Sequence, residues 1–365
     1  MGSSKQISSR EVISMVLLLQ QGGLFWMLPM LLLGNNGTAG LITLLPGVLF
    51  GMTILAVCVF WGNRFQEQEI LQWLMQRLGK PAGMGIGLLF VLLYLAFAVI
   101  CLDSLVEVIS SQLLRNTPRL LILIPVFLLS GWLAWNGLED IARLMVLCIA
   151  PAVILFLVAL AGNVRDFSLE HLLPLQLQAP EQLLQSSMHS IFSFSSFLVL
   201  FLIYPALHSK KNVGWKLSSA IIWSALMLLV WTGLALGVFG QSSVGPFTWL
   251  PLELARMIRL GSFLERTEAL FTAVWMVIVL VDGGLLLWSV SESAHQLLKK
   301  QKSRWLHWSL ILAAFLLCAG VGNRLELFRM EQIFATVTAV ILPILLLVVW
   351  MATVLQNRKK EGQQP

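Results

Sequence analysis

The sequence has little charge. Asp, Glu, Lys and Arg make up 12% of its 365 residues, whereas 58% are hydrophobic and the mean hydropathy is +0.85. A soluble protein of this length needs far more charge to cover its surface, which excludes a soluble globular class. The four cysteines lie far apart in apolar runs, so they support neither a disulfide framework nor a metal site. We expect one polytopic, all-α membrane domain spanning residues 1–365.

Catalytic motifs are missing as well. The chain has no GxSxG, no P-loop, no HExxH and no Cys/His cluster, so we predict neither an enzyme nor a bound cofactor or metal. The basic run at residues 299–304, KKQKSR, could contact nucleic acid or anionic lipid. We interpret it as a topology signal beside the membrane, and we predict no nucleic-acid partner.

Apolar runs of about 17 to 25 residues predict the membrane spans. Ten candidates lie near residues 12–33, 39–61, 84–112, 119–136, 141–162, 187–207, 215–239, 266–292, 307–322 and 332–355. An even number of spans places both termini on one side. If that side is cytoplasmic, all ten lysines fall in cytoplasmic segments, and every basic residue of the outer segments is an arginine. The positive-inside rule therefore predicts cytoplasmic termini.

The first and sixth spans are interrupted. The first contains Gln20, Gln21, Gly22 and Gly23 near its middle, with Pro29 beyond them. The sixth contains serines at positions 193, 195 and 196 and a proline at 205. Corresponding interruptions in two halves of five spans are typical of inverted-repeat transporters, in which unwound backbone builds a ligand site near the membrane midplane. The repeats would cover about 11–162 and 187–355; the alternative is that small residues merely allow close helix packing.

Acidic residues inside spans are costly and are candidates for function. Asp103 and Glu107 share one face of the third span, because they are four residues apart. They could bind a ligand amine or a proton, or pair with an arginine of an outer loop, and Asp103 is the better ligand candidate. Asp282 lies deeper, in the eighth span, before Gly283 and Gly284, which favour close helix approach or local unwinding.

The segment at residues 245–271 is too charged to span a membrane. Its apolar and charged residues alternate at helical spacing, which predicts an outer amphipathic helix at about 247–261. Such a helix would pack on the membrane domain or contact a partner protein.

Four stretches of the chain carry a resemblance. They are LELARMIRLGSFLERTEALF before the eighth span, NGLEDIARL at residues 136–144, ISSRE at residues 7–11, and the pattern from Gly22 to Pro29. Together they closely resemble the B subunits of bacterial spore germinant receptors, within the amino acid/polyamine/organocation superfamily. The resemblance runs essentially end to end.

The resemblance implies a LeuT-like fold of ten spans with 5+5 inverted repeats, in the inner membrane of an endospore. It implies binding of a small germinant, often an amino acid, beside an A subunit and a C-subunit lipoprotein. Carried over to this sequence, the pocket falls on Gln21, Gly22, Gly23 and Leu24 of the first span and on Phe194, Ser195 and Ser196 of the sixth. With the candidates above, the predicted ligand-binding set is Gln20, Gln21, Gly22, Gly23, Leu24, Asp103, Phe194, Ser195, Ser196 and Asp282.

Three functions fit these observations. The first is a receptor subunit that binds a germinant and signals through partner subunits. The second is an ion-coupled amino acid permease that acts on its own, which the same fold would support. The third is a scaffold subunit with a vestigial pocket. We favour the receptor subunit, because the resemblance covers the whole chain.

Overall fold

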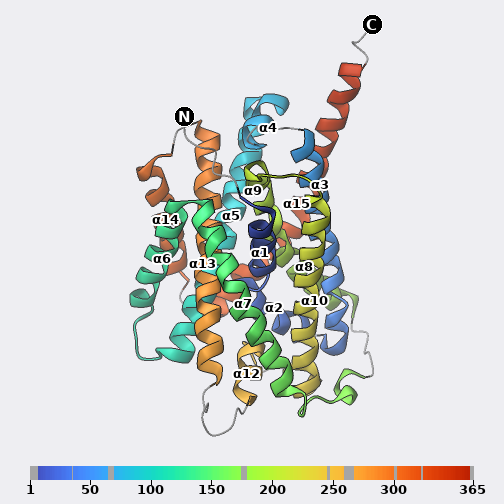
Figure 1. The fold of residues 1–365 in the computed structure, drawn as a ribbon, viewed down its shortest axis with the longest axis vertical. Coiled ribbons are helices and arrows are strands. Elements are labelled where there is room, and N and C mark those ends of the chain that lie inside the picture. Colours follow the sequence, from blue (N-terminus) through green and yellow to red (C-terminus); the bar gives the residue numbers. More distant parts are fainter. Residues whose placement is uncertain are drawn as a thin grey trace.

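The computed structural model describes residues 7–34, 36–64, 70–173, 179–244, 247–258, 267–299, 302–321 and 324–361. These residues form a bundle of helices that run roughly along one axis (Figure 1). The short helix α4 (Ile70–Leu78) lies at one end of the bundle, and the short helix α12 (Leu250–Met257) lies at the other. We call these the α4 end and the α12 end.

Eight helical stretches of the described chain are long and apolar enough to cross a membrane. They are Gly37–Gly62, Lys80–Leu113, Arg119–Asn136, Leu138–Asn163, Pro180–Ala206, Val213–Phe239, Thr267–Leu298 and Leu325–Leu347. The α-helices that form them, of which α3 and α15 extend beyond the apolar stretch, are α3 (Leu44–Arg64), α5 (Lys80–Val108), α6 (Arg119–Asn136), α7 (Leu138–Asn163), α8 (Pro180–Ser195), α9 (Leu200–Ile203), α10 (Val213–Phe239), α13 (Thr267–Leu298) and α15 (Arg324–Glu361). Each of the eight overlaps one predicted span.

The remaining two predicted spans are also helical, but shorter. The first is divided into α1 (Ser9–Leu19) and α2 (Gly23–Leu33), with residues 20–22 outside both helices. The ninth is α14 (Arg304–Ala319), an apolar helix of 16 residues. About ten spans with an interrupted first helix are therefore present, as the sequence predicts.

The sixth span is interrupted more mildly than the first. Its α-helix α8 ends at Ser195, and a 3₁₀ helix, Ser196–Val199, continues the chain into α9. The chain here is wound more tightly instead of being unwound. The interruption of the sixth span therefore lies at Ser195 and Ser196, as predicted, but it is a 3₁₀ segment instead of unwound chain.

The central pair of helices is α5 and α13, which share the largest contact in the bundle. On the other side of the core, α8 packs against α3 and α15. The divided first span lies among these helices: α1 contacts α7 and α10, and α2 contacts α8 and α5. The break at residues 20–22 is thus surrounded by protein, as irregular backbone at membrane depth requires.

The start of α1 is fixed by its own sequence. Ser8 and Glu11 form a capping box: the Glu11 N–H donates to Ser8 Oγ at 3.3 Å, and the Ser8 N–H donates to Glu11 Oε2 at 2.7 Å. The preceding residue, Ile7, forms a parallel bridge with Leu207, just after the sixth span. The Ile7 N–H donates to the carbonyl of Ala206 at 2.9 Å. This bridge ties the beginning of the first span to the end of the sixth.

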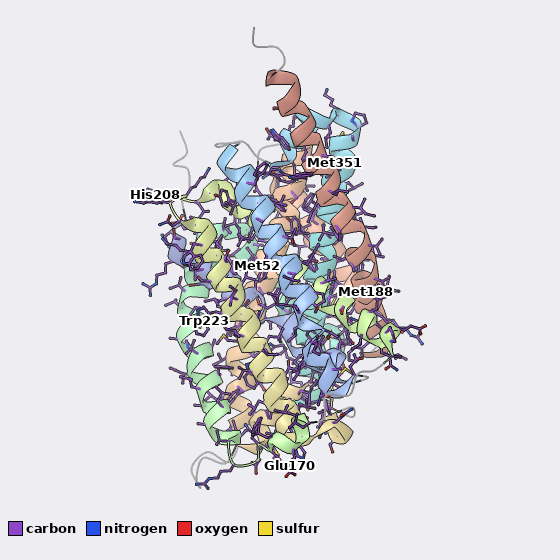
Figure 2. The ribbon with its side chains drawn as sticks, turned by 90° about the vertical axis from the view of Figure 1, so that its right-hand side faces the viewer. Met52, Glu170, Met188, His208, Trp223 and Met351 are labelled. Carbon is purple, nitrogen blue, oxygen red and sulfur yellow. The ribbon has the colours of Figure 1, made fainter. Side chains whose placement is uncertain are left out.

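The outer surface of the bundle is apolar over much of its length. Trp223 of α10 and Leu147 of α7 are 63% and 70% exposed, and Figure 2 shows Trp223 on the flank of the bundle. Such side chains are unfavourable in water but suit contact with lipid tails. The exposed apolar flank and the long apolar helices identify a multi-pass membrane protein.

The predicted amphipathic helix at 247–261 corresponds in part to α12, at the bottom of Figure 1. Its apolar face is buried through Leu250 and Leu254, whereas Arg256 pairs with Glu253 at 2.7 Å on the polar face. The Thr267 hydroxyl at the start of α13 donates to the Ala255 carbonyl at 2.7 Å. The helix therefore packs on the bundle; residues 259–261 of the prediction lie outside the described residues.

Candidate functional site at the break in the first span

The break in the first span exposes backbone groups that a continuous helix would pair. The helix α1 ends at Leu19, and α2 begins at Gly23, so the carbonyl end of one helix faces the N–H end of the other. The carbonyl end carries a partial negative charge and the N–H end a partial positive charge. The Trp275 indole N–H of α13 donates to the carbonyl of Gly22 at 3.4 Å. A break of this kind offers both an anion-attracting and a cation-attracting pole.

The two glutamines of the break are held on different sides of it. Gln20 is fully buried, and its Nε2 donates to Ser193 Oγ of α8 at 2.6 Å. Its Oε1 is buried without a hydrogen-bond partner among the described residues. Gln21 is partly buried, and its Nε2 donates to the Ser224 carbonyl of α10 at 3.4 Å. Gln20 therefore connects the two interrupted spans and keeps one acceptor available.

Asp282 of α13 lies directly against the break. A Cβ atom added to Gly22 would overlap its Oδ2 and would lie 2.8 Å from its Cγ, so any side chain at this position would displace the carboxylate. Asp282 is 1% exposed, and neither carboxylate oxygen has a hydrogen-bond partner among the described residues. An isolated buried carboxylate is strongly unfavourable. The arrangement is suited to a cationic group, or to a proton, placed between Asp282 and the break.

The glycines after Asp282 allow close packing and do not unwind the helix. The helix α13 is continuous from Thr267 to Leu298. A Cβ on Gly283 would overlap the Leu102 side chain of α5, and one on Gly284 would lie 2.9 Å from Leu133 Cδ2 of α6. Of the two alternatives in the sequence analysis, close helix approach is the one observed.

The hydroxyls of the two predicted serines of the sixth span are hydrogen-bonded within that span. The Ser195 and Ser196 hydroxyls donate to carbonyls of their own span, those of Ile191 at 2.6 Å and Ser193 at 2.8 Å. The Phe194 ring makes an edge contact with the Phe197 ring, with centroids 5.7 Å apart. All three predicted residues are buried, but the serine that reaches the first span is Ser193.

Asp103 belongs to a different cluster. It forms an ion pair with Arg119, which also contacts Glu107 Oε2 at 3.1 Å, and Cys318 Sγ donates to Asp103 Oδ1 at 2.8 Å. Pairing with an arginine, one of the alternatives that the sequence left open, is thus observed for both Asp103 and Glu107. No hydrogen bond or ion pair between described residues joins Asp103 to Gln20, Gly22 or Asp282, so its role in ligand binding stays a prediction.

Two predicted residues are described only in part. Gly23 and Leu24 form the first turn of α2, but the side chains at positions 23–26 lie outside what the structure describes. Gly23 contributes a backbone N–H at the N-terminus of this helix, where an anionic group would be favoured.

One buried ionisable pair was not predicted from the sequence. His189 Nδ1 of α8 and Glu331 Oε1 of α15 are 2.8 Å apart, and both side chains are almost fully buried. The tenth span was predicted to begin at residue 332, which left Glu331 in a loop; in fact α15 begins at Arg324. A cue was available: Leu327 and Met330, upstream of the predicted boundary, share the helical spacing of Phe334 within the predicted span.

The sequence of this chain matches a known family over most of its length. The family described as "Spore germination protein" matches residues 6–324. The chain belongs to this family. Among its curated relatives, Spore germination protein YndE of Bacillus subtilis is 21% identical over 316 residues, covering 85% of this chain and 86% of YndE. Spore germination protein B2 of the same organism is 21% identical over 335 residues, covering 88% of each chain.

Solved structures similar to this spore germination protein are transporters of the LeuT fold. MhsT in complex with L-phenylalanine superposes with a TM-score of 0.63 at 14% identity, over 92% of this chain and 88% of MhsT. A Na⁺-coupled sialic acid symporter superposes with a TM-score of 0.59 at 11% identity, over 92% of this chain and 75% of the symporter. These likenesses confirm the predicted LeuT-like fold, and the family match confirms the resemblance.

Proposed function

We propose that this protein is the germinant-binding B subunit of a nutrient germinant receptor, and that its ligand is a small amino acid-like zwitterion. The observation that carries this proposal is the buried Asp282 carboxylate, unpaired among the described residues and held against the break at Gly22. Membership of the spore germination protein family supplies the biological setting.

The chemistry of the break suits both charges of a zwitterion. An ammonium group between Asp282 and the carbonyl end of α1 would receive a counter-charge and hydrogen-bond acceptors, including Gln20 Oε1. A carboxylate would be favoured at the N-terminus of α2, where the Gly23 N–H has no partner within the helix. The two poles lie on either side of residues 20–22, so a ligand with both groups on one carbon fits better than a simple amine or acid.

The proposal includes partners and a location. In this family setting the subunit would act with an A subunit and a C-subunit lipoprotein in the inner membrane of the endospore. In the topology predicted from the sequence, all ten lysines fall on the side of the termini, which supports a cytoplasmic position for that side. The α4 end belongs to it, because Lys80 begins α5 directly after α4. The α12 end would then face outward, where a germinant arrives.

The first experiment is a thermal-shift screen of the purified full chain against the common L-amino acids. We expect at least one to raise the melting temperature, because a ligand bound to the folded state stabilises it. Asp282→Asn keeps the shape of the side chain but removes its charge, and it should weaken the binding of that ligand at least tenfold. Asp166→Asn, the same change at an exposed position, is the matched control and should bind normally.

An ion-coupled permease acting on its own is the second candidate, and the LeuT fold favours it. Uptake of the labelled ligand by this chain alone in liposomes separates the two. Saturable, gradient-driven uptake would overturn the receptor proposal, whereas binding without uptake supports it. In spores, dependence of the response on the A and C subunits is the corresponding positive result.

A further inference from the structure

An apolar cavity of about 60 Å³ lies beside the break in the first span. Leu155 and Phe156 of α7 form one part of its wall, and Met227 and Trp231 of α10 form another. Pro251 of α12 lines it as well. None of the described residues around it carries a charge, and most of their side chains are apolar. Because a charged group would lose its hydration there without gaining a partner, the cavity suits an uncharged, apolar group.

The cavity adjoins the break itself. Gln21 lines it, and Trp275, another lining residue, donates its indole N–H to the Gly22 carbonyl at 3.4 Å. Gly22 in turn lies against the Asp282 carboxylate. Two described contacts, both made by Gly22, therefore join the wall of the cavity to Asp282.

The cavity and Asp282 also share one face of α13. Phe271, Trp275 and Ile278 line the cavity and precede Asp282 by eleven, seven and four residues. At 3.6 residues per turn, all three side chains leave the helix within about 40° of the direction of Asp282. Ile278 is about 6 Å from Asp282 along the helix axis, toward the α12 end. A ligand paired with Asp282 therefore has the cavity about one helical turn away.

The size of the cavity favours side chains of intermediate length. At roughly 15 Å³ for each water-sized group, a volume of about 60 Å³ takes about four such groups. The side chains of valine, leucine and isoleucine contain three or four carbon atoms. Alanine has one, which leaves most of the cavity unfilled, and phenylalanine has seven, which exceeds it.

We propose that this cavity receives the side chain of the germinant, and that the germinant is an aliphatic amino acid with three or four side-chain carbons: valine, leucine or isoleucine. The proposal rests on the function proposed above, because the ammonium group of the same ligand pairs with Asp282. Asp282 recognises a charge that all amino acids share. The apolar walls then select among amino acids by the size of the side chain.

Binding of labelled amino acids to the purified full chain in lipid nanodiscs measures this selection. The probes are L-alanine, L-valine, L-leucine and L-phenylalanine. Each buried CH₂ group strengthens binding about fourfold, so leucine should bind about 50-fold more tightly than alanine, with valine between them. Phenylalanine should bind more weakly than leucine, because its ring does not fit the cavity.

Two substitutions change the size of the cavity in opposite directions. Ala152→Leu adds three carbons to its wall and should lower the ratio of leucine to alanine affinity at least tenfold. Met227→Ala removes three non-hydrogen atoms and should raise the ratio of phenylalanine to leucine affinity about tenfold. The matched controls are Ala150→Leu, at an exposed position of α7, and Met351→Ala, at an exposed position of α15. Both controls should leave the ratios unchanged.

Two results would overturn the proposal. One is equal affinity for alanine and leucine in the unsubstituted chain, and the other is a set of ratios that neither substitution changes. Both are expected if a lipid tail fills the cavity instead. Met227→Ala creates space and removes no polar group, so it provides the test even where Ala152→Leu does not fold.

Failure of the proposed function looks different. In that case none of the amino acids binds, or Asp282→Asn leaves the affinity for all four unchanged. If both proposals are correct, Asp282→Asn weakens all four by a similar factor and preserves their order, because the substitution removes the shared charge contact and leaves the cavity as it is.

Discussion

A methyl group on Gly22 tests whether Asp282 is held against the break as the structure places it. Gly22→Ala would put a carbon atom into Asp282 Oδ2, 2.8 Å from Cγ and 3.3 Å from Cβ of the same side chain. The carboxylate must then rotate away, or α13 must move. Overpacking of this kind in a close-packed interior costs about 1–3 kcal/mol. We expect the free energy of unfolding to fall by that amount.

The matched control is Gly233→Ala in α10. A Cβ atom there has no neighbour within 4 Å, and helix propensity alone favours alanine by roughly 0.5–1 kcal/mol. Unfolding can be followed by SDS titration in mixed micelles, with tryptophan fluorescence as the signal. The two substitutions are chemically identical, so a difference of about 2 kcal/mol or more between them reports the surroundings of Gly22.

A double-mutant cycle identifies the cause. In an Asp282→Ala background the carboxylate is gone, and the nearest remaining atom of that side chain would be its Cβ at 3.3 Å. The penalty of Gly22→Ala should therefore shrink by about 1–2 kcal/mol, and any effect on the backbone alone cancels in the cycle. If the two changes add within about 0.5 kcal/mol, or if Gly22→Ala is as mild as Gly233→Ala, Asp282 does not lie where the structure places it.

Three further substitutions test contacts elsewhere in the bundle, each measured by the same titration. Arg119→Met leaves the buried Asp103 carboxylate without its cation and should lower the free energy of unfolding by about 3–5 kcal/mol. Adding Asp103→Asn should restore part of it, and full stability in the single variant would contradict the ion pair. Ser8→Ala removes the cap of α1 and should cost about 1 kcal/mol, whereas no loss would show that the capping box is not formed. Gly62→Ala would overlap the Tyr204 ring and should cost about 1–3 kcal/mol, a penalty that Tyr204→Ala must relieve if the contact is real.

The sequence was sufficient to predict the spans and the break in the first one. Long apolar runs can be recognised without tertiary information, and two glutamines followed by two glycines interrupt such a run wherever it packs. Asp282 was also found from sequence, because a buried acid in an apolar helix is rare enough to stand out. Its proximity to Gly22, 260 residues earlier in the chain, required the structure.

The choice among the serines of the sixth span could not be made from sequence. A serine hydroxyl in a helix can donate to a carbonyl of the preceding turn, as Ser195 and Ser196 do, or it can face a neighbouring helix. Which of the two occurs depends on the rotation of α8 about its axis. That rotation brings Ser193 to Gln20, and no local pattern encodes it.

Asp103 of the third span and Glu331 of the tenth show two further limits of prediction from sequence. Asp103 is an acidic residue inside an apolar helix, which favoured a role in ligand binding. In the structure Arg119, sixteen residues later at the start of the next helix, forms an ion pair with it. Glu331 was assigned to a loop because hydropathy fades near the helix start, where polar residues can still face the bundle. In both cases the partner, and not the residue itself, decides whether the charge is satisfied, and partners far apart in sequence are fixed by packing.

Under the proposed function, the sizes of these interactions bear on how a bound germinant would act as a signal. To move a two-state equilibrium from 1:99 to 99:1, a ligand must prefer one state by about 5.5 kcal/mol. When a buried carboxylate gains or loses its charge partner, the free energy of the folded protein changes by about 3–5 kcal/mol. An ammonium group that binds Asp282 in one state only would therefore supply most of that preference. The remainder would come from burial of the ligand's apolar groups, at about 0.8 kcal/mol for each CH₂ group. A ligand without side-chain carbons would then be a weaker signal than one with two or three, even where both bind Asp282 equally.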